Sequence, residues 1–479
     1  MKITIKHNLP FWLIIISFLF VLIIRDLFRD GMFMDGVLYT SVAKNLSNGL
    51  GSFWHPHFSQ TTMFIFHEQP PLLFGIESIF FQLLGNSIYV ERIYGLLILS
   101  VTIFLIHKLW ECIFYKKQEK DISWLPTIFW LTIPVCFWSY SNNMIEPTMG
   151  VFDLASLLFI YKALIHKNKI YFYLTLAAIM LIAASMCKGA QGLFPLTAIF
   201  FYWVVTRNIS FSKMLIFSFY LSILIIGFYG VILLNDNVRS SYEMYFNNRI
   251  VTTFSNPAST HTDRFYIIKQ LFSELIPVLI LISGMMIFKR IKKYSLIVHE
   301  DILQIVVLFF LIALSGSLPL MLTLEQSGFY LVTTFPYYAI CFAAYFAPLC
   351  LKLLKQLDIN SIVFKRWRIA VILFLTASII ISIYTIASIP KRDKEELNDI
   401  YAFGEIIPNG SIIGIHQEMS NDWRLHTYFI RYFYISIDAS STIHKYFLLD
   451  KTLDVKLVPD NYHEIDLPTK KYTLYIHNE

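Results

Sequence analysis

Charged residues are scarce in this chain of 479 residues: Asp, Glu, Lys and Arg together make up 15% of it, whereas hydrophobic residues make up 56%. A soluble globular domain carries about 25% charged residues. The shortage excludes a chain that meets only water, because so much apolar surface must face another apolar medium. The sequence therefore predicts an integral membrane protein surrounded by membrane lipids, and its 17% of aromatic residues suits helices in lipid and at its interfaces.

Cysteine is scarce as well. The five cysteines lie in or beside apolar runs and none forms a C-x-x-C pair: Cys112, Cys136, Cys187, Cys341 and Cys350. This pattern indicates neither a disulfide framework nor a zinc site. The net charge is only +6 and the basic residues lie between apolar runs, so we expect no nucleic acid partner.

About eleven apolar stretches approach the roughly 20 residues that a membrane-spanning helix needs. The first is interpreted as an uncleaved helix, because no small-residue cleavage site follows it. The stretch 170–206 is divided in two at the turn signal Lys188-Gly189-Ala190-Gln191-Gly192. The predicted spans are 9–28, 92–112, 124–141, 148–165, 170–187, 190–206, 213–234, 267–288, 302–323, 329–351 and 368–389.

The loops between these spans orient the chain. If the spans alternate in direction, five basic loops fall on the same side as Lys2 and Lys6, and the positive-inside rule places that side in the cytoplasm. The basic loops are 116–120, 166–169, 207–213, 289–293 and 352–368. The opposite side carries a first external loop at 30–91, a turn at 141–147, a loop at 235–266 and the tail from Lys391. We therefore expect a multi-pass protein of a bacterial inner membrane, with its chemistry outside.

The tail differs from the rest in composition. Short apolar or alternating runs in it are separated by Gly, Pro, Asn and Asp: Ser411–His416, Tyr428–Ile437, Thr452–Val458 and Tyr472–His477. The predicted fold class is therefore mainly α, with a polytopic membrane module at 1–390 and a small external α/β domain at 391–479.

The first external loop opens with Asp35, after which Leu38, Val42 and Leu46 recur every four residues. This spacing predicts an amphipathic helix that ends at Asn48-Gly49, is too short to span, and lies along the membrane surface. Two interpretations of Asp35 are considered: it is the N-cap of the helix, or it is a catalytic carboxylate at the membrane interface. One residue can play both roles.

Histidines follow in His55-Pro56-His57 and in His67-Glu68, ahead of Pro70-Pro71, which we expect to start the next helix. A divalent metal site and interfacial polar packing are both open for them. The spacing matches no specific zinc motif, so polar packing is preferred and no cofactor is firmly indicated.

Several short motifs occur in a fixed order along the chain. They are Asp35-Gly36-x-x-Tyr39, Gly49-x-Gly51-Ser52-Phe53-Trp54, Pro70-Pro71-Leu72, Leu84-Gly85-Asn86-Ser87 to Glu91-Arg92, Lys188-Gly189-x-x-Gly192-Leu193, and Tyr330-Leu331 with Pro336. In this order the chain resembles, over residues 9–350, GT-C glycosyltransferases of the protein mannosyltransferase and lipid A aminoarabinose transferase type.

The resemblance implies an inverting transfer of a sugar from a polyprenyl-phosphate donor to a glycan, lipid or protein acceptor. Asp35 matches the first-loop carboxylate, which would act as general base, and Glu146 is the second catalytic candidate. Glu146 is equally explained as an acidic residue at a helix start before Pro147. Expected substrate-binding residues are Tyr39, His67, Glu68, Arg92, Lys188, Arg249 and Tyr330, the last four for the phosphate. Each basic residue among them is also explained by snorkelling to lipid headgroups.

The chain departs from the aminoarabinose transferase pattern at three places. Gln69 and Leu38 stand where that branch commonly has Lys and Arg, and Gln326 and Ser327 lie where its late Lys is expected. The aminoarabinose substrate is therefore not inferred.

Three other functions are weighed against the transferase: a flippase for lipid-linked saccharides, a glycan polymerase or ligase outside the GT-C fold, and a non-catalytic GT-C relative. A flippase would need charged or broken helices near the midplane. Most spans here lack central charges, which favours chemistry at the interface.

Overall fold

The computed structural model describes residues 5–165, 167–255, 263–294, 298–388, 390, 392–440 and 442–478. Lys2, His166, Lys391 and the part 256–262 of the predicted loop lie outside the described residues. The chain forms two compact units. The helical unit consists of Met1–Leu27, Gly95–Ser141 and Ile145–Tyr384, and the loop–tail unit of Phe28–Tyr94, Asn142–Met144 and Thr385–Glu479. The first loop thus forms one unit with the tail, and its assignment to the membrane module stays a prediction.

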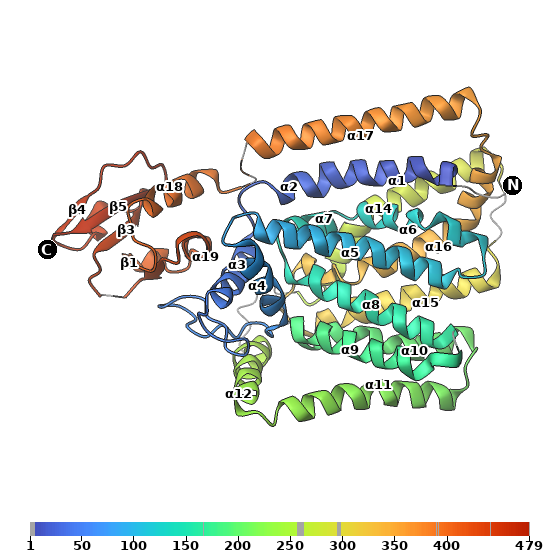
Figure 1. The fold of residues 1–479 in the computed structure, drawn as a ribbon, viewed down its shortest axis with the longest axis horizontal. Helices are drawn as coiled ribbons and strands as arrows, with labels where there is room; N and C mark the ends of the chain where they lie inside the picture. The colour runs from blue at the N-terminus through green and yellow to red at the C-terminus, as the bar shows by residue number, and fades with distance from the viewer. Residues whose placement is uncertain are drawn as a thin grey trace. The chain divides into compact units, whose positions relative to one another are not determined.

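Long helices lie side by side in the helical unit (Figure 1). Among the described residues, nine stretches are long and apolar enough to cross a membrane, which confirms the predicted mainly α, polytopic membrane fold. The long helices are α1 (Ile5–Leu19), α5 (Val90–Ile113), α8 (Ile145–Ile165), α9 (Ile170–Lys188), α11 (Phe211–Ile232), α14 (Tyr266–Ile291), α15 (Glu300–Ser317), α16 (Phe335–Gln356) and α17 (Ile362–Ser388). The shorter ones are α2 (Arg25–Leu27), α6 (Trp124–Leu131), α7 (Pro134–Ser141), α10 (Thr197–Thr206), α12 (Asp236–Tyr245) and α13 (Thr252–Ser255).

One predicted span takes a different form. The stretch 124–141 is divided between α6 and α7, because Pro134 starts a new helix and cannot continue the hydrogen bonding of the old one. The stretch 170–206 is divided as predicted: the chain turns back at the 3-10 segment Gly189–Leu196, where Gly189 has φ 65°. A methyl group on Gly192 would overlap the backbone of Ala184, whereas eight residues of straight helix would separate the two by about 12 Å.

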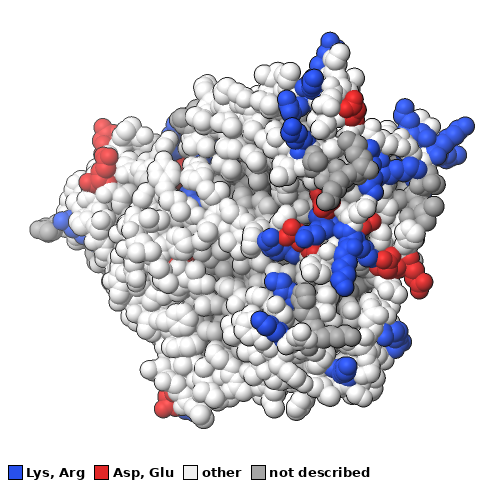
Figure 2. Space-filling model, turned by 45° about the vertical axis from the view of Figure 1, so that its right-hand side comes forward, with Lys and Arg blue, Asp and Glu red and all other residues white. Residues whose placement is uncertain are grey.

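The predicted basic loops meet at one end of the helical unit, where Figure 2 shows Lys and Arg gathered beside a large area without charge. Contacts join the segments there: Lys117 pairs with Asp301, Lys355 donates to Gln118, the Tyr294 hydroxyl donates to Gln356, and the Asn8 amide donates to the Asp121 carbonyl. The clustering fits the positive-inside rule. Which side of the membrane this end faces stays a prediction.

The loop–tail unit joins two helices of the first loop to a small α/β domain. Its helices are α3 (Met34–Ser47), α4 (Leu72–Leu84), α18 (Lys394–Gly404) and α19 (Trp423–Phe433). Its strands are β1 (Ile412–Ile415), β2 (Ser436–Asp438), β3 (Tyr446–Asp450), β4 (Tyr462–Glu464) and β5 (Tyr472–His477). The sheet has the order β2-β1-β3-β5-β4, parallel across β2, β1 and β3 and antiparallel across β3, β5 and β4.

Two of the four runs predicted in the tail are strands, since β1 lies within Ser411–His416 and β5 spans Tyr472–His477. The other two differ. Tyr428–Ile437 contains the end of α19 before β2 begins, because its aromatic residues continue the helical spacing that starts at Leu425. Thr452–Val458 holds a single 3-10 turn, Val455–Leu457, and the neighbouring strand is β3.

Helix α3 is present with the predicted end at Asn48. It does not present one polar face, because α4 and α19 pack against it and residues 39–45 are all buried. The expected position of α3 along the membrane surface stays a prediction. Pro71 is the residue immediately before α4, as expected.

A buried ion pair ties the tail to the start of α5. Arg431 Nη2 lies 2.8 Å from Glu91 Oε2, and both side chains are almost fully buried. We predict that Arg431→Met lowers the free energy of unfolding by about 3–5 kcal/mol, because it leaves the Glu91 carboxylate buried and unpaired. The thermal unfolding midpoint in detergent measures this loss.

Adding Glu91→Gln to Arg431→Met should restore part of that midpoint, since no unpaired charge then remains buried. Lys470→Ala is the control, because the ion pair of Lys470 with Glu395 is exposed and worth less than about 1 kcal/mol. Equal losses from Arg431→Met and Lys470→Ala would contradict the prediction.

Candidate active site

A pocket of about 210 Å³ opens beside the first turn of α3 in the loop–tail unit. Its lining combines apolar and acidic side chains: Met34, Asp35, Leu38, Met63, Glu68, Trp423 and Thr427. The structure thus brings together Asp35 and Glu68, two residues that the sequence singled out. Helix α19 contributes the remaining wall with Trp423 and Thr427.

Asp35 is the second residue of α3, and Phe33 occupies the N-cap position without a side-chain cap hydrogen bond. The interpretation of Asp35 as the cap is therefore wrong. A carboxylate in the first turn still interacts favourably with the helix dipole. The side chain of Asp35 is half-buried and lines the pocket.

The backbone on both sides of Asp35 is fixed by side chains from elsewhere in the unit. The Phe33 N–H donates to Asn142 Oδ1 at 2.9 Å, and the Met32 N–H donates to the Tyr428 hydroxyl at 3.2 Å. Gly36 lies so close to the Asn142 carbonyl that any Cβ would overlap it, which explains the glycine after Asp35. The start of α3 is thereby held by the 142–144 segment and by α19.

A buried carboxyl group on α4 contacts α3. Glu77 has no exposed surface, and its Oε1 accepts hydrogen bonds from Asn143 Nδ2 at 2.8 Å and from the Thr40 hydroxyl at 3.4 Å. The other oxygen, Oε2, has no partner among the described residues. Burial and the nearby Glu91 raise the pKa of Glu77 to about 8, so the group is largely protonated at neutral pH.

A second cluster lies in the helical unit and brings together three other predicted site residues. Lys188, the last residue of α9, forms an ion pair with Glu146, which is in the first turn of α8 and fully buried. Lys188 Nζ also lies 3.8 Å from the ring centroid of Tyr330, within reach of a cation–π interaction. Gln191 Nε2 donates to the Tyr330 carbonyl at 2.8 Å and joins the turn to the same segment.

The remaining predicted residues lie in varied surroundings. In the helical unit Arg249 Nη2 pairs with Glu325 Oε2 at 2.8 Å. In the loop–tail unit Tyr39 is buried with its ring near Phe74, and Arg92 is buried with its Nη1 unpartnered among the described residues. His67 Nδ1 lies 2.9 Å from the Ile65 carbonyl. Substrate-binding roles for these residues stay predictions, as does the meeting of Asp35 with Glu146 and Lys188.

The histidines of the first loop make polar packing contacts. His57 Nδ1 lies 2.8 Å from the Phe64 carbonyl and its Nε2 lies 2.9 Å from the Tyr434 hydroxyl, so both ring nitrogens are used. Over the described part of the chain, no three His, Cys, Asp or Glu side chains are grouped to hold a metal ion.

Sequence reasoning missed Trp423 and Thr427 of the pocket as well as the buried pair of Glu77 and Asn143. The aromatic residues of α19 gave no signal, because a helix of the tail cannot be assigned to a loop nearly 400 residues earlier from spacing alone. Asn143 lies beside the candidate Glu146 in the sequence, but its partner Glu77 lies on a helix of the first loop.

The comparisons with known proteins agree on one fold. A family model described as dolichyl-phosphate-mannose-protein mannosyltransferase matches residues 68–232, which include Glu146 and Lys188 but not Asp35. No curated protein matches the chain.

Solved structures match over nearly the whole length. ArnT from Cupriavidus metallidurans bound to undecaprenyl phosphate is 11% identical with a TM-score of 0.63, covering 97% of this chain and 96% of that one. The apo state of the same protein is 10% identical with a TM-score of 0.62, and the match covers 96% of each chain. The apo oligosaccharyltransferase from Archaeoglobus fulgidus is 13% identical with a TM-score of 0.50, covering 92% of this chain and 65% of that one. The resemblance to GT-C glycosyltransferases is confirmed, and the chain has their fold.

The protonation of Glu77 predicts a pH effect on stability. Its pKa is about 8 in the folded state against 4.5 ordinarily, so between these values the folded chain keeps a proton that the unfolded chain has lost. The free energy of unfolding should therefore fall as pH rises from 4.5 to 8, by at most about 1.4 kcal/mol per pH unit.

Glu77→Gln should remove this contribution while keeping the hydrogen bond from Asn143. Thermal unfolding of both proteins in one detergent between pH 5 and pH 8 measures the difference. Parallel curves would show that Glu77 does not carry the effect.

Proposed function

We propose that this chain is an inverting glycosyltransferase that moves a sugar from a polyprenyl-phosphate donor to an acceptor hydroxyl. The observation that carries the proposal is a carboxylate, Asp35, in a pocket at the start of α3 within a GT-C fold. The similar ArnT is described as bound to undecaprenyl phosphate, which supports a polyprenyl-phosphate carrier for this chain.

Asp35 acts as general base in this reaction. Its carboxylate takes the proton of the acceptor hydroxyl while that oxygen forms a bond to the anomeric carbon. The bond from the anomeric carbon to the phosphate oxygen breaks on the opposite face of the sugar, and its electron pair leaves with the phosphate. Inversion at the anomeric carbon follows from this single displacement.

The charge that grows on the departing phosphate calls for a cation, and we assign this role to Lys188. Without phosphate, Glu146 is the counter-ion that a buried ammonium group requires. The phosphate competes with Glu146 for Lys188, which limits its affinity and favours release of the spent carrier.

The proposed location is a bacterial inner membrane, with the basic end of the helical unit in the cytoplasm and the chemistry on the outer face. The gathered basic loops support this orientation through the positive-inside rule. A flippase receives less support, because the fold similarity is to transferases and the pocket lies outside the spanning stretches.

The test is a transfer assay with the purified protein. Labelled polyprenyl-phosphate sugars are offered with glycan, lipid and protein acceptors, with and without a chelator. Transfer of label with inversion supports the proposal. Carrier binding without transfer to any acceptor class would contradict it.

Asp35→Asn should lower kcat by about 10²–10⁴-fold, because the amide cannot accept the hydroxyl proton at neutral pH. Binding of undecaprenyl phosphate should be unchanged in this variant. Retained kcat would show that Asp35 is a helix-start carboxylate with no part in the chemistry.

Lys188→Met should lower kcat more than it changes either KM, because the leaving phosphate loses the cation that stabilises it. Lys162→Met is the matched control, because Lys162 lies in the last turn of α8 and also faces aromatic rings, those of Phe159 and Tyr173. Equal effects of the two substitutions would point to general loss of packing.

A further inference from the structure

We propose that the acceptor is a carbohydrate and that Trp423 and Thr427 of α19 form its binding subsite together with Asp35 and Glu68. This inference rests on the proposed function and names the acceptor class that the pocket selects. The four side chains line the same pocket, and two of them come from the tail.

The lining suits a sugar ring because it offers both kinds of contact that such a ring makes. Carboxylate oxygens accept hydrogen bonds, so Asp35 and Glu68 suit the hydroxyl donors of a sugar. The Thr427 hydroxyl already donates to the Arg424 carbonyl at 3.0 Å, which leaves its oxygen as a further acceptor. The Trp423 indole and the apolar Met34, Leu38 and Met63 provide surface for the C–H face of the ring.

Charge excludes the phosphate end of the donor from this pocket. Among the described residues that line it, two are acidic and none is Lys or Arg. A phosphate placed there would meet two side chains of like charge in the pocket lining. The hydroxyl that Asp35 deprotonates belongs to the acceptor, so the pocket around Asp35 is assigned to the acceptor.

Size favours a single ring. The volume of about 210 Å³ is below the roughly 300–1,000 Å³ of pockets that enclose drug-sized ligands. One monosaccharide unit at the end of a glycan therefore enters, while the rest of the acceptor stays outside the pocket.

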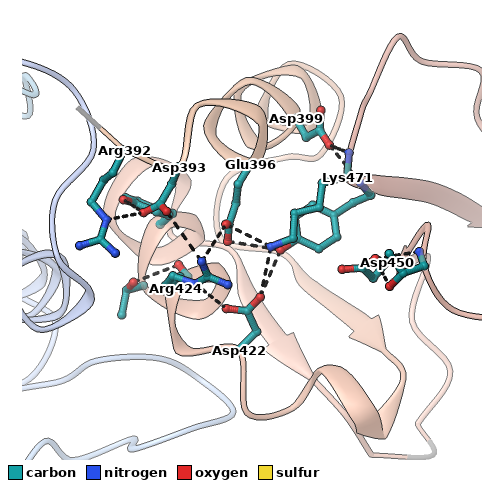
Figure 3. Close-up of polar contacts among 12 residues, drawn as sticks. Arg392, Asp393, Glu396, Asp399, Asp422, Arg424, Asp450 and Lys471 are labelled. Atoms are coloured by element: carbon teal, nitrogen blue, oxygen red, sulfur yellow. Dashed lines mark hydrogen bonds and ion pairs between the residues drawn. The ribbon is translucent and has the colours of Figure 1, made fainter. Parts of the chain in front are cut away.

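The residues on either side of Trp423 are held in place by a network of charged side chains (Figure 3). Arg424 Nε lies 3.4 Å from Asp422 Oδ1, and Lys471 Nζ lies 3.5 Å from Asp422 Oδ2 and 3.1 Å from Glu396 Oε2. Burial works against the charge of Asp422, but Lys471 and Arg424 hold its pKa below the usual range. The start of α19 is thus fixed before an acceptor binds, which reduces the entropy lost on binding.

The first measurement uses saturation-transfer NMR to detect binding of a panel of methyl glycosides to the purified full chain. In the wild-type protein, saturation should pass to the ring protons of at least one glycoside. Trp423→Ala should abolish this NMR signal, and Trp423→Phe should retain part of the signal because the aromatic face remains. Tyr89→Ala is the control, since Tyr89 is an exposed aromatic residue of the same unit outside the pocket.

The second measurement is the kinetics of transfer. Trp423→Ala should raise the acceptor KM about tenfold, the value of one lost aromatic contact, and leave the donor KM within about twofold. The conservative Trp423→Phe should recover most of the acceptor KM. A general structural defect would instead change both KM values and lower the thermal unfolding midpoint.

The outcomes separate the subsite from the proposed function. Glycoside binding that depends on Trp423, without transfer from any donor, would overturn the transferase and keep the subsite. Transfer with an unchanged acceptor KM in Trp423→Ala, transfer only to peptide or lipid acceptors, or no glycoside binding by the wild-type protein would overturn the subsite.

Discussion

The fixed start of α3 is the constraint on which the rest of the site depends. Asp35 lies between Phe33, whose N–H is bound by Asn142, and Gly36, whose missing Cβ lets the Asn142 carbonyl approach. Before α3 begins, Asp30 accepts hydrogen bonds from the hydroxyls of Tyr401 at 2.7 Å and Tyr432 at 3.0 Å. A base that must meet a hydroxyl within hydrogen-bonding distance needs such a fixed backbone, because small displacements weaken proton transfer strongly.

This rigidity is obtained with buried polar groups, which are costly unless they are partnered. Lys44 donates to the Arg431 carbonyl at 2.7 Å, and burial together with the nearby Arg431 lowers the pKa of Lys44 to about 8. The pKa of Glu77 is shifted in the opposite direction, upward, by burial and by the nearby Glu91. Near pH 8 both groups are therefore partly neutral, so the unit carries less buried charge than its sequence implies. The polar layer between α3, α4 and α19 fixes their register more narrowly than an apolar layer would.

Much of the fold could be predicted from the sequence because long apolar runs and basic loops are strong local signals. The turn at Lys188–Gly192 and the end of α3 at Asn48 belong to this class, as does β5. The candidate carboxylate Asp35 followed from local pattern and resemblance. What could not be predicted depends on contacts across hundreds of residues. The Tyr428 hydroxyl accepts a hydrogen bond from the Met32 N–H, and Trp423 lines a pocket with Asp35. The residue periodicity of the tail and of the first loop does not indicate that these two segments contact each other.

The two clusters differ in sign, and this difference is the physical basis for dividing the proposed reaction between them. The pocket at α3 presents the carboxylates of Asp35 and Glu68, which suit hydroxyl groups and repel phosphate. In the helical unit, Lys188 pairs with Glu146 and Arg249 pairs with Glu325. Each of these two cations therefore already has a carboxylate partner. A cation that is already paired with a carboxylate binds phosphate only by displacing that carboxylate. It therefore stabilises the more highly charged leaving phosphate more than it stabilises the phosphodiester of the donor. Stabilisation that grows as the phosphate departs acts on the transition state, which is where a transferase needs it.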